Sequence, residues 1–325
     1  MKAFEYAAPQ TEADAVRLLA DSPRAEVLAG GTDLVGLMKS LIVQPDRVVN
    51  IMEIDSIRGI APTDEGGVEI GAAVTLEGLL DSPELAPYQA LQEAAASVNS
   101  MQLQCQGTIG GDLCQRPRCW FFRNGQDLLG ASAEQGDNRH HAILGNTGAA
   151  KFVSASRLGP ALIALEATLR VIGPGQDEQW IGAADFFRTP RHSGQRETVL
   201  EPGQLLTHIV LPPLEGRLSA AYEVKHGCGP EDPMAAAAVA FTHRAGVVEH
   251  ATIVMGHVAP TPWVADSAAL ALAGQVVNAM TAERIGELAV AGATPLSNNQ
   301  HKVQLAKVAV KRALLQAAGL ETGGF

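Results

Sequence analysis

The sequence predicts an α+β protein with two domains, and three observations lead to this prediction. The chain has 325 residues, which is more than one ordinary hydrophobic core accommodates. Its first half alternates short strand-like and helix-like segments around a Gly-Gly turn. Its second half has strand-like runs followed by helix-like runs, typical of an antiparallel sheet covered by helices. The turn-rich segment "GPGQDEQ" favours a boundary near residue 176, giving domains 1–176 and 177–325.

The first domain opens with a predicted strand, glycine turn and helix. "EVLAG" predicts a buried strand that stops at Gly30 and Gly31. Apolar residues at 34, 35, 37, 38, 41 and 42 then follow a helical period, with Thr32 or Asp33 as N-cap. "RVVNIM" and "GVEIGAAVT" predict further strands, and "LEGLLDS" and "YQALQEAAASV" predict helices. The periodic βαβ series of a Rossmann domain is missing.

The second domain is expected to hold one antiparallel sheet. Its strands are predicted at "LLTHIVLPP", "AAYEVKHG", "AAAAVAFTHR" and "VVEHATIVMG". Arg244-Ala245-Gly246 joins the last two as a hairpin, because glycine tolerates a positive φ. Helices are then predicted at "WVADSAALALAG", "TAERIGELAVAG" and "NQHKVQLAKVAVKRALLQAAG".

Composition and charge limit the possible functions. With 46% hydrophobic and 18% charged residues, the chain has the composition of a globular protein. The net charge of −11 argues against a nucleic-acid partner, which would require a surplus of Lys and Arg. The N-terminus has no signal-like apolar core, and we expect no membrane insertion. Few cysteines favour a reducing compartment, so we expect the cytoplasm; export with a signal-bearing partner stays open.

Two glycine loops in the first domain are typical of an anion site. "LAGGTDL" (28–34) and "GTIGGDL" (107–113) both place Gly-Gly at the start of a helix-like segment. A backbone without Cβ atoms lets a phosphate approach, and free N–H groups at a helix start attract an anion. One such loop could equally be a tight turn that caps a helix. Two loops in one domain favour a nucleotide diphosphate held from both sides, although neither is a Walker or GxGxxG motif.

The motifs "VLAGGTDLVGLMK", "GTIGGDL", "LRVIGP" and "GHVAPTPW" resemble the FAD-binding subunit of molybdenum hydroxylases, the xanthine and carbon monoxide dehydrogenase family. The likeness covers the whole chain and keeps the family's motif order. It implies a vanillyl-alcohol-oxidase (PCMH)-type FAD domain followed by the family's small flavoprotein C-terminal domain. It also implies non-covalent FAD, a molybdopterin-binding large subunit and a 2Fe–2S small subunit as partners.

The resemblance assigns residues to the FAD site. The first pyrophosphate loop would comprise Val27, Leu28, Ala29, Gly30, Gly31, Thr32, Asp33 and Leu34. The second loop would comprise Thr108, Gly110, Gly111 and Asp112. The family commonly has Asn where this chain has Asp112. An ionised Asp side chain cannot donate a hydrogen bond, so a phosphate contact of Asp112 would come from its backbone. Lys225 in "YEVKHG" matches a flavin-contacting lysine that could stabilise a reduced, anionic isoalloxazine. Relatives carry Ser-Asp where this chain has Ser156-Arg157, which puts that contact in doubt.

The segment "LCQRPRCWFF" resembles an aldehyde oxidoreductase branch whose flavin subunit carries a 4Fe–4S cluster in an inserted loop. Here residues 120–150 contain no cysteine, and Cys105, Cys114, Cys119 and Cys228 lack the spacing of a cluster or a zinc site. His140-His141 is expected to be an ordinary loop pair, because adjacent side chains point apart. We therefore expect no metal in this chain.

The aromatic and arginine residues from Arg116 to Arg123 have two interpretations, a docking surface for a partner subunit or packing against the flavin edge. No Ser-His-Asp or paired-carboxylate pattern suggests a catalytic residue. The expected function is that of an FAD-carrying electron-transfer subunit, which takes electrons from iron–sulfur centres and passes them to an external acceptor. Two alternatives remain open: a self-contained flavin oxidoreductase, and an assembly subunit without flavin.

Overall fold

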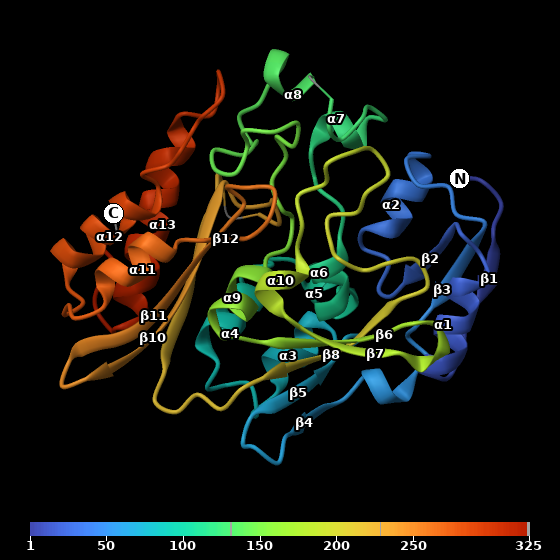
Figure 1. The fold of residues 1–325 in the computed structure, drawn as a ribbon, viewed down its shortest axis with the longest axis horizontal. Coiled ribbons are helices and arrows are strands. Elements are labelled where there is room, and N and C mark those ends of the chain that lie inside the picture. The colour runs from blue at the N-terminus through green and yellow to red at the C-terminus, as the bar shows by residue number, and fades with distance from the viewer. Residues whose placement is uncertain (131, 228, 324–325) are drawn as a thin grey trace.

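The computed structural model describes residues 1–130, 132–227 and 229–323. Cys228, one of the four cysteines considered above, lies outside the described residues. Figure 1 shows a small N-terminal sheet at one end of the long axis, a larger sheet in the middle, and a third sheet with its helices at the other end. Strands and helices combine in the α+β arrangement that the sequence predicts.

The N-terminal sheet has three parallel strands in the order β1-β3-β2. Its elements are β1 (Glu5–Ala7), α1 (Glu12–Ala20), β2 (Ala25–Leu28), α2 (Leu34–Lys39) and β3 (Arg47–Asn50). The predicted strand, glycine turn and helix are confirmed. The helix ends at Lys39 rather than at Ile42, because Leu41 has φ 58° and leaves the right-handed helical region.

The middle sheet has five antiparallel strands in the order β4-β5-β8-β6-β7. The strands are β4 (Ile60–Pro62), β5 (Val68–Gly71), β6 (Thr168–Ile172), β7 (Glu178–Gly182) and β8 (Leu205–Leu211). The helices that accompany it are α3 (Leu76–Asp81), α4 (Gln89–Ala96), α5 (Met101–Gln106), α6 (Ile109–Cys114), α9 (Gly159–Ala164) and α10 (Ala183–Phe186). Two 3₁₀ turns, η1 (Asp55–Ile57) and η2 (Pro174–Gln176), complete this part.

The strand pairing of this sheet favours another position for the domain boundary than the expected one. A division at 176/177 would separate β6 from β7 and β8, which are its hydrogen-bonded neighbours in one sheet. The strand "LLTHIVLPP" is β8, the central strand of the first unit, and the expected four-stranded grouping in the second domain was wrong in this respect. We propose a boundary in the turn at 215–217, after β8.

The third sheet is antiparallel, with strand order β12-β11-β10-β9. Its strands are β9 (Leu218–Val224), β10 (Ala235–Arg244), β11 (Val247–Gly256) and β12 (Trp263–Val264). Ala245 and Gly246 have φ 51° and 81° and form the predicted two-residue hairpin between β10 and β11. The covering helices are α11 (Asp266–Leu272), α12 (Ala279–Ala289) and α13 (His301–Ala317), seen in red and orange in Figure 1.

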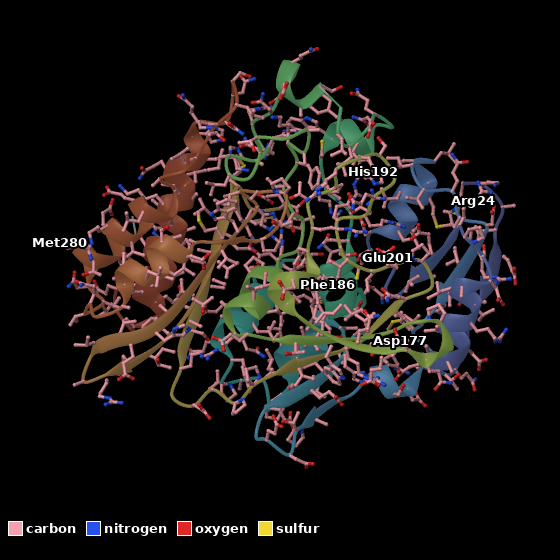
Figure 2. All side chains as sticks on the ribbon, viewed as in Figure 1. Arg24, Asp177, Phe186, His192, Glu201 and Met280 are labelled. Atoms are coloured by element: carbon pink, nitrogen blue, oxygen red, sulfur yellow. The ribbon has the colours of Figure 1, made fainter. Side chains whose placement is uncertain are left out.

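The polar excursion after α6 holds two short helices, α7 (Trp120–Arg123) and α8 (Ser132–Gln135), which project at the top of Figure 1. Figure 2 shows all side chains: the labelled Phe186 is central and fully buried, whereas Met280 lies on the outer face of the helical layer. Among the described residues, no helix is long and apolar enough to cross a membrane.

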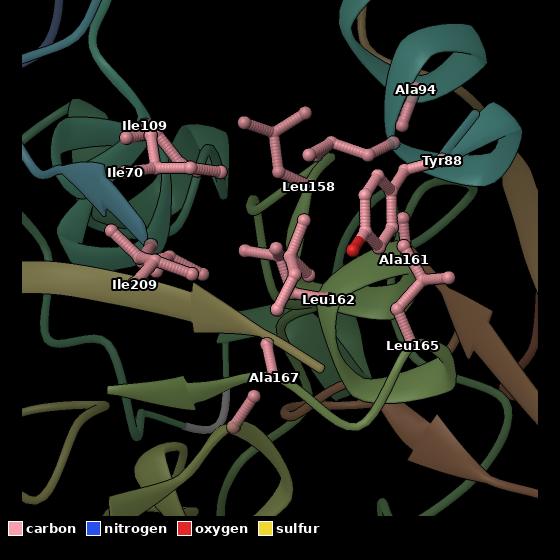
Figure 3. Packing of buried hydrophobic residues seen from close by; sticks show 14 of the residues in the cluster. Ile70, Tyr88, Ala94, Ile109, Leu158, Ala161, Leu162, Leu165, Ala167 and Ile209 are labelled. Carbon is pink, nitrogen blue, oxygen red and sulfur yellow. The ribbon is translucent and has the colours of Figure 1, made fainter. Parts of the chain in front are cut away.

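A buried apolar cluster supports the second glycine loop. Ile109, the first residue of α6, is fully buried beside Ile70 of β5, and Ile209 of β8 belongs to the same cluster (Figure 3). The cluster also includes Ala238 and Val254 from the third sheet, so the two units share part of one core. Truncating such a side chain to Ala costs about 2–5 kcal/mol of stability. The start of α6 is therefore rigidly placed.

Candidate functional site

The first glycine loop follows β2 and presents unbonded N–H groups. Leu28 ends the strand by accepting a 2.9 Å hydrogen bond from the N–H of Ile51, and Gly31 adopts φ 73°, a left-handed conformation that glycine tolerates. In the described part of the chain, the backbone N–H groups of Gly30, Gly31 and Thr32 have no protein acceptor. Three adjacent N–H donors without a protein partner fit an anion such as a phosphate.

The second glycine loop lies directly against the first. A Cβ atom added to Gly30 would lie 1.5 Å from the carbonyl oxygen of Gln106 and 3.3 Å from the backbone nitrogen of Gly107. Gln106 ends α5, and Gly107 begins the loop "GTIGGDL". Only glycine permits this approach, so the two loops form one surface. Sequence reasoning missed Gln106, which lies outside the motif, and it did not assign Gly107, the first residue of "GTIGGDL", to the site.

In the second loop, unlike the first, the N–H groups of Gly110 and Gly111 donate to acceptors within the protein. Thr108 caps α6, and its Oγ1 accepts a 3.1 Å bond from the N–H of Gly111. The N–H of Gly110 donates to the carbonyl of Ala72 at 2.9 Å, and a Cβ at Gly110 would meet Ala72 at 2.8 Å. Gly110 and Gly111 therefore bring the backbone close to its neighbours. Gly111 is exposed at the loop's face, whereas Thr108 is buried.

The Asp112 side chain points into the protein. Its carboxylate accepts hydrogen bonds from the Ser156 hydroxyl at 2.5 Å and from the N–H groups of Arg157 and Leu158 at 3.1 and 3.0 Å. Gln115 Nε2 adds a fourth bond at 3.0 Å. Burial raises the pKa of this carboxyl, while these hydrogen bonds oppose the rise. Because all four donors come from the protein, Asp112 holds the segment 156–158 to the second loop.

A cleft of about 450 Å³ lies beyond Arg157, between the middle sheet's helices and the third sheet. The Arg157 guanidinium donates to the carbonyl of Ser97 at 3.1 Å and to the carbonyl of Glu231 at 2.6 Å. Lys225 also donates to the Ser97 carbonyl and lies 3.4 Å from Glu223. Two cations thus meet at one carbonyl on the cleft wall. Lys225 is thereby connected, through Ser97 and Arg157, to Asp112 of the second loop.

The Asp33 side chain does not cap α2 as expected. Its carboxylate accepts a 2.9 Å bond from the N–H of Arg116 and a 2.7 Å bond from Arg123 Nη2. Arg116 also donates to Glu197 at 3.0 Å and lies over the ring of the buried Phe122. Arg116 and Arg123 are therefore engaged within the chain. Their contacts count against the docking interpretation for these two arginines, whose partners lie 81 to 90 residues away in the sequence.

The cysteines of the described chain are free thiols at 105, 114 and 119. Cys119 Sγ lies 3.2 Å from His141 Nε2. Burial, with Lys302 nearby, lowers the pKa of His141 to about 4, so its neutral ring can accept from the thiol. Among the described residues, no group of three or more His, Cys, Asp or Glu side chains is arranged to hold a metal ion.

Two family models match successive parts of the chain. The model of the FAD binding domain in molybdopterin dehydrogenase matches residues 2–214, and that of the CO dehydrogenase flavoprotein C-terminal domain matches residues 231–317. The chain belongs to the molybdopterin dehydrogenase FAD-binding family. The limits of the two models bracket the turn at 215–217, where strand pairing also divides the chain.

Several relatives and solved structures are similar over the whole length. The FAD-binding subunit PaoB of Escherichia coli aldehyde oxidoreductase is 30% identical over 98% of this chain and 99% of its own. The medium chain of carbon monoxide dehydrogenase from Afipia carboxidovorans is 29% identical over 97% and 96%. A reconstituted CO dehydrogenase from Oligotropha carboxidovorans superposes with a TM-score of 0.78, 25% identity, and 98% and 99% coverage. As a member of this FAD-binding family, the chain has FAD as its cofactor.

Proposed function

We propose that this chain is the FAD-carrying electron-transfer subunit of a molybdenum hydroxylase complex of the aldehyde or xanthine dehydrogenase type. The observation that supports it most is the contact between the two glycine loops, beside the three unbonded N–H groups of Gly30, Gly31 and Thr32. These donors suit the diphosphate of a dinucleotide. The loop from Val27 to Leu34 would supply the donors, and Thr108, Gly110 and Gly111 would form the facing side of the cradle. The N–H of Asp112 already donates to the carbonyl of Thr108 at 2.9 Å, so we do not propose it as a phosphate donor.

The cleft beyond Arg157, which Asp112 connects to the second loop, is the proposed position of the isoalloxazine ring. Its wall holds Lys225 and Arg157, and its floor includes the small side chains of Ala221 and Ala237. When bound, FAD accepts electrons and releases them to another acceptor. The two cations at the Ser97 carbonyl favour negative charge in the cleft, and Glu223 opposes them. This chain thus binds, orients and electrostatically tunes the cofactor.

The proposed partners are a molybdopterin-binding large subunit and a 2Fe–2S small subunit. The relatives' own descriptions as an FAD-binding subunit and as medium chains support an assembly of several chains. The sequence also predicts no catalytic residue in this chain, because no Ser-His-Asp or paired-carboxylate pattern is present. Substrate oxidation would therefore occur on the large subunit, and electrons would reach this chain through iron–sulfur centres. The cytoplasm remains the expected location.

The direct test is to isolate the chain from its native source without disrupting complexes, then measure subunits, FAD, molybdenum and iron. We expect FAD on this chain, molybdenum and iron on co-purifying chains, and substrate-driven flavin reduction only in the complex. An isolated chain that oxidises an aldehyde or purine at the rate of the complex would support a self-contained oxidoreductase instead. A colourless chain that takes up no added FAD would support the assembly subunit.

A further inference from the structure

Asp33 places a carboxylate beside the first glycine loop, where the diphosphate is proposed to bind. It directly follows Thr32, the last of the three residues with unbonded N–H groups, and its side chain is 15% exposed. An ionised carboxylate here repels a diphosphate, because like charges a few ångströms apart in a partly buried site interact strongly. The loop therefore needs a counter-charge before it can hold a dinucleotide.

The segment Arg116–Arg123, which we term the strap, supplies this charge. Arg123 Nη2 donates to Asp33 at 2.7 Å, and the N–H of Arg116 donates to the other carboxylate oxygen at 2.9 Å. Arg118 lies 3.9 Å from Asp33 and adds a second cation. The carboxylate is thus surrounded by positive charge from a segment more than 80 residues away in the chain.

The strap holds Arg123 in a fixed position. Its Nε donates to the carbonyl of Pro117 at 2.8 Å, and its Nη2 also donates to the carbonyl of Arg116 at 2.7 Å. The side chain is 21% exposed. These two carbonyls fix the planar guanidinium, which presents its charge to Asp33 in one orientation. A fixed donor costs little conformational freedom when the loop closes around a ligand.

We infer that the strap is a positioning device for FAD retention, in which Arg123 neutralises Asp33 and holds the first glycine loop open for a diphosphate. This inference rests on the proposed role of the loop but adds a residue that no glycine motif predicts. It also explains why an acidic residue is tolerated beside a phosphate-binding backbone. Arg123 acts on the ligand through Asp33 and the loop.

The test is an FAD titration of apo-protein variants, with ADP as a competing probe that carries the diphosphate without the isoalloxazine. Arg123→Met leaves Asp33 without its closest counter-charge, and we expect the dissociation constants of both ligands to rise about tenfold or more. Arg123→Lys keeps the charge and should lose less affinity. Adding Asp33→Asn to Arg123→Met should recover affinity, because the uncompensated carboxylate is then removed.

Arg139→Met is the matched control within the same excursion, since Arg139 is exposed and pairs with its neighbour Asp137. It should bind FAD normally. Apo-protein melting temperatures separate folding from binding: a purely structural strap would lower them without affinity recovery in Asp33→Asn/Arg123→Met. That pattern, or normal FAD and ADP binding by Arg123→Met while Gly31→Val binds neither, would overturn the inference. Normal FAD binding by Gly31→Val would instead refute the loop assignment itself.

Discussion

Gly30 packs against the carbonyl oxygen of Gln106 so closely that a Cβ atom added to Gly30 would lie 1.5 Å from that oxygen. Gln106 lies 76 positions beyond Gly30 and directly precedes the second glycine loop, so their contact makes the two loops one surface. The geometry explains why glycine is required at position 30 for packing and at position 31 for its φ of 73°. It also connects the parallel N-terminal sheet to the helix start at Thr108.

Gly30→Ala should separate the two loops. The added methyl group collides with backbone that cannot turn away, so we expect a loss of about 1–3 kcal/mol of stability and weaker FAD binding. Urea unfolding and FAD titration would measure the two effects. Gly36→Ala is the control, because no atom lies within 4 Å of its added Cβ. Equal behaviour of the two variants would mean that the loops do not touch as described.

Lys225→Met should make the bound flavin harder to reduce. Removing a cation from the cleft wall leaves Glu223 nearby and disfavours added electrons. We expect the two-electron midpoint potential to fall by roughly 30 mV or more, equivalent to about 1.4 kcal/mol. Spectroelectrochemical titration of FAD-loaded protein would measure it. Lys311→Met, which removes a partner of Glu283 on the outer helices, should leave the potential unchanged.

Lowering the pH should reduce the stability of the folded chain, because His141 is buried. Burial lowers its folded pKa to about 4, below the ordinary value of 6.5, so the unfolded chain binds its proton first as the pH falls. Stability is therefore lost between about pH 6.5 and 4, by about 3 kcal/mol for this group. Urea unfolding in excess FAD across this range would measure the slope. A His141→Gln variant with an undiminished slope would rule out this origin.

Cys119→Ser should leave the visible spectrum unchanged. The thiol faces the His141 ring, and we expect no cluster in this chain, so the flavin alone should absorb visible light. Iron and acid-labile sulfide should be substoichiometric in the isolated subunit. A broad iron–sulfur absorbance that disappears in Cys119→Ser would contradict this expectation.

Local patterns predicted the elements, but not which distant segments meet. The strand, glycine turn and helix around Gly31 follow from apolar period and turn chemistry, and the hairpin at Ala245 follows from the glycine beside it. β8 was misassigned because an apolar strand does not encode its neighbours; pairing with β5 and β6 depends on the whole sheet.

The same distinction between local patterns and distant contacts holds for the candidate site. The motifs pointed to both glycine loops and to Lys225, and the sequence offered Thr32 or Asp33 as the cap of the following helix. The Asp33 carboxylate bonds Arg123 instead, a partner 90 residues away that no local rule identifies. Asp112 likewise serves the turn at Ser156, and the Ser97 carbonyl shared by Arg157 and Lys225 has no side-chain signal at all.

The most direct measurement is the FAD content of Gly31→Val after gel filtration, compared with the unmodified chain and Gly36→Ala. Valine at φ 73° is strained and places branched carbons beside the unbonded N–H groups, so we expect a folded protein that has lost its FAD. Gly111→Val, whose added Cβ would lie 2.9 Å from Thr108 Oγ1, should behave alike from the second loop. The unmodified chain and Gly36→Ala should retain one FAD each, and we expect acid to release it, because we propose non-covalent binding. A folded Gly31→Val protein with a full complement of FAD would contradict the account.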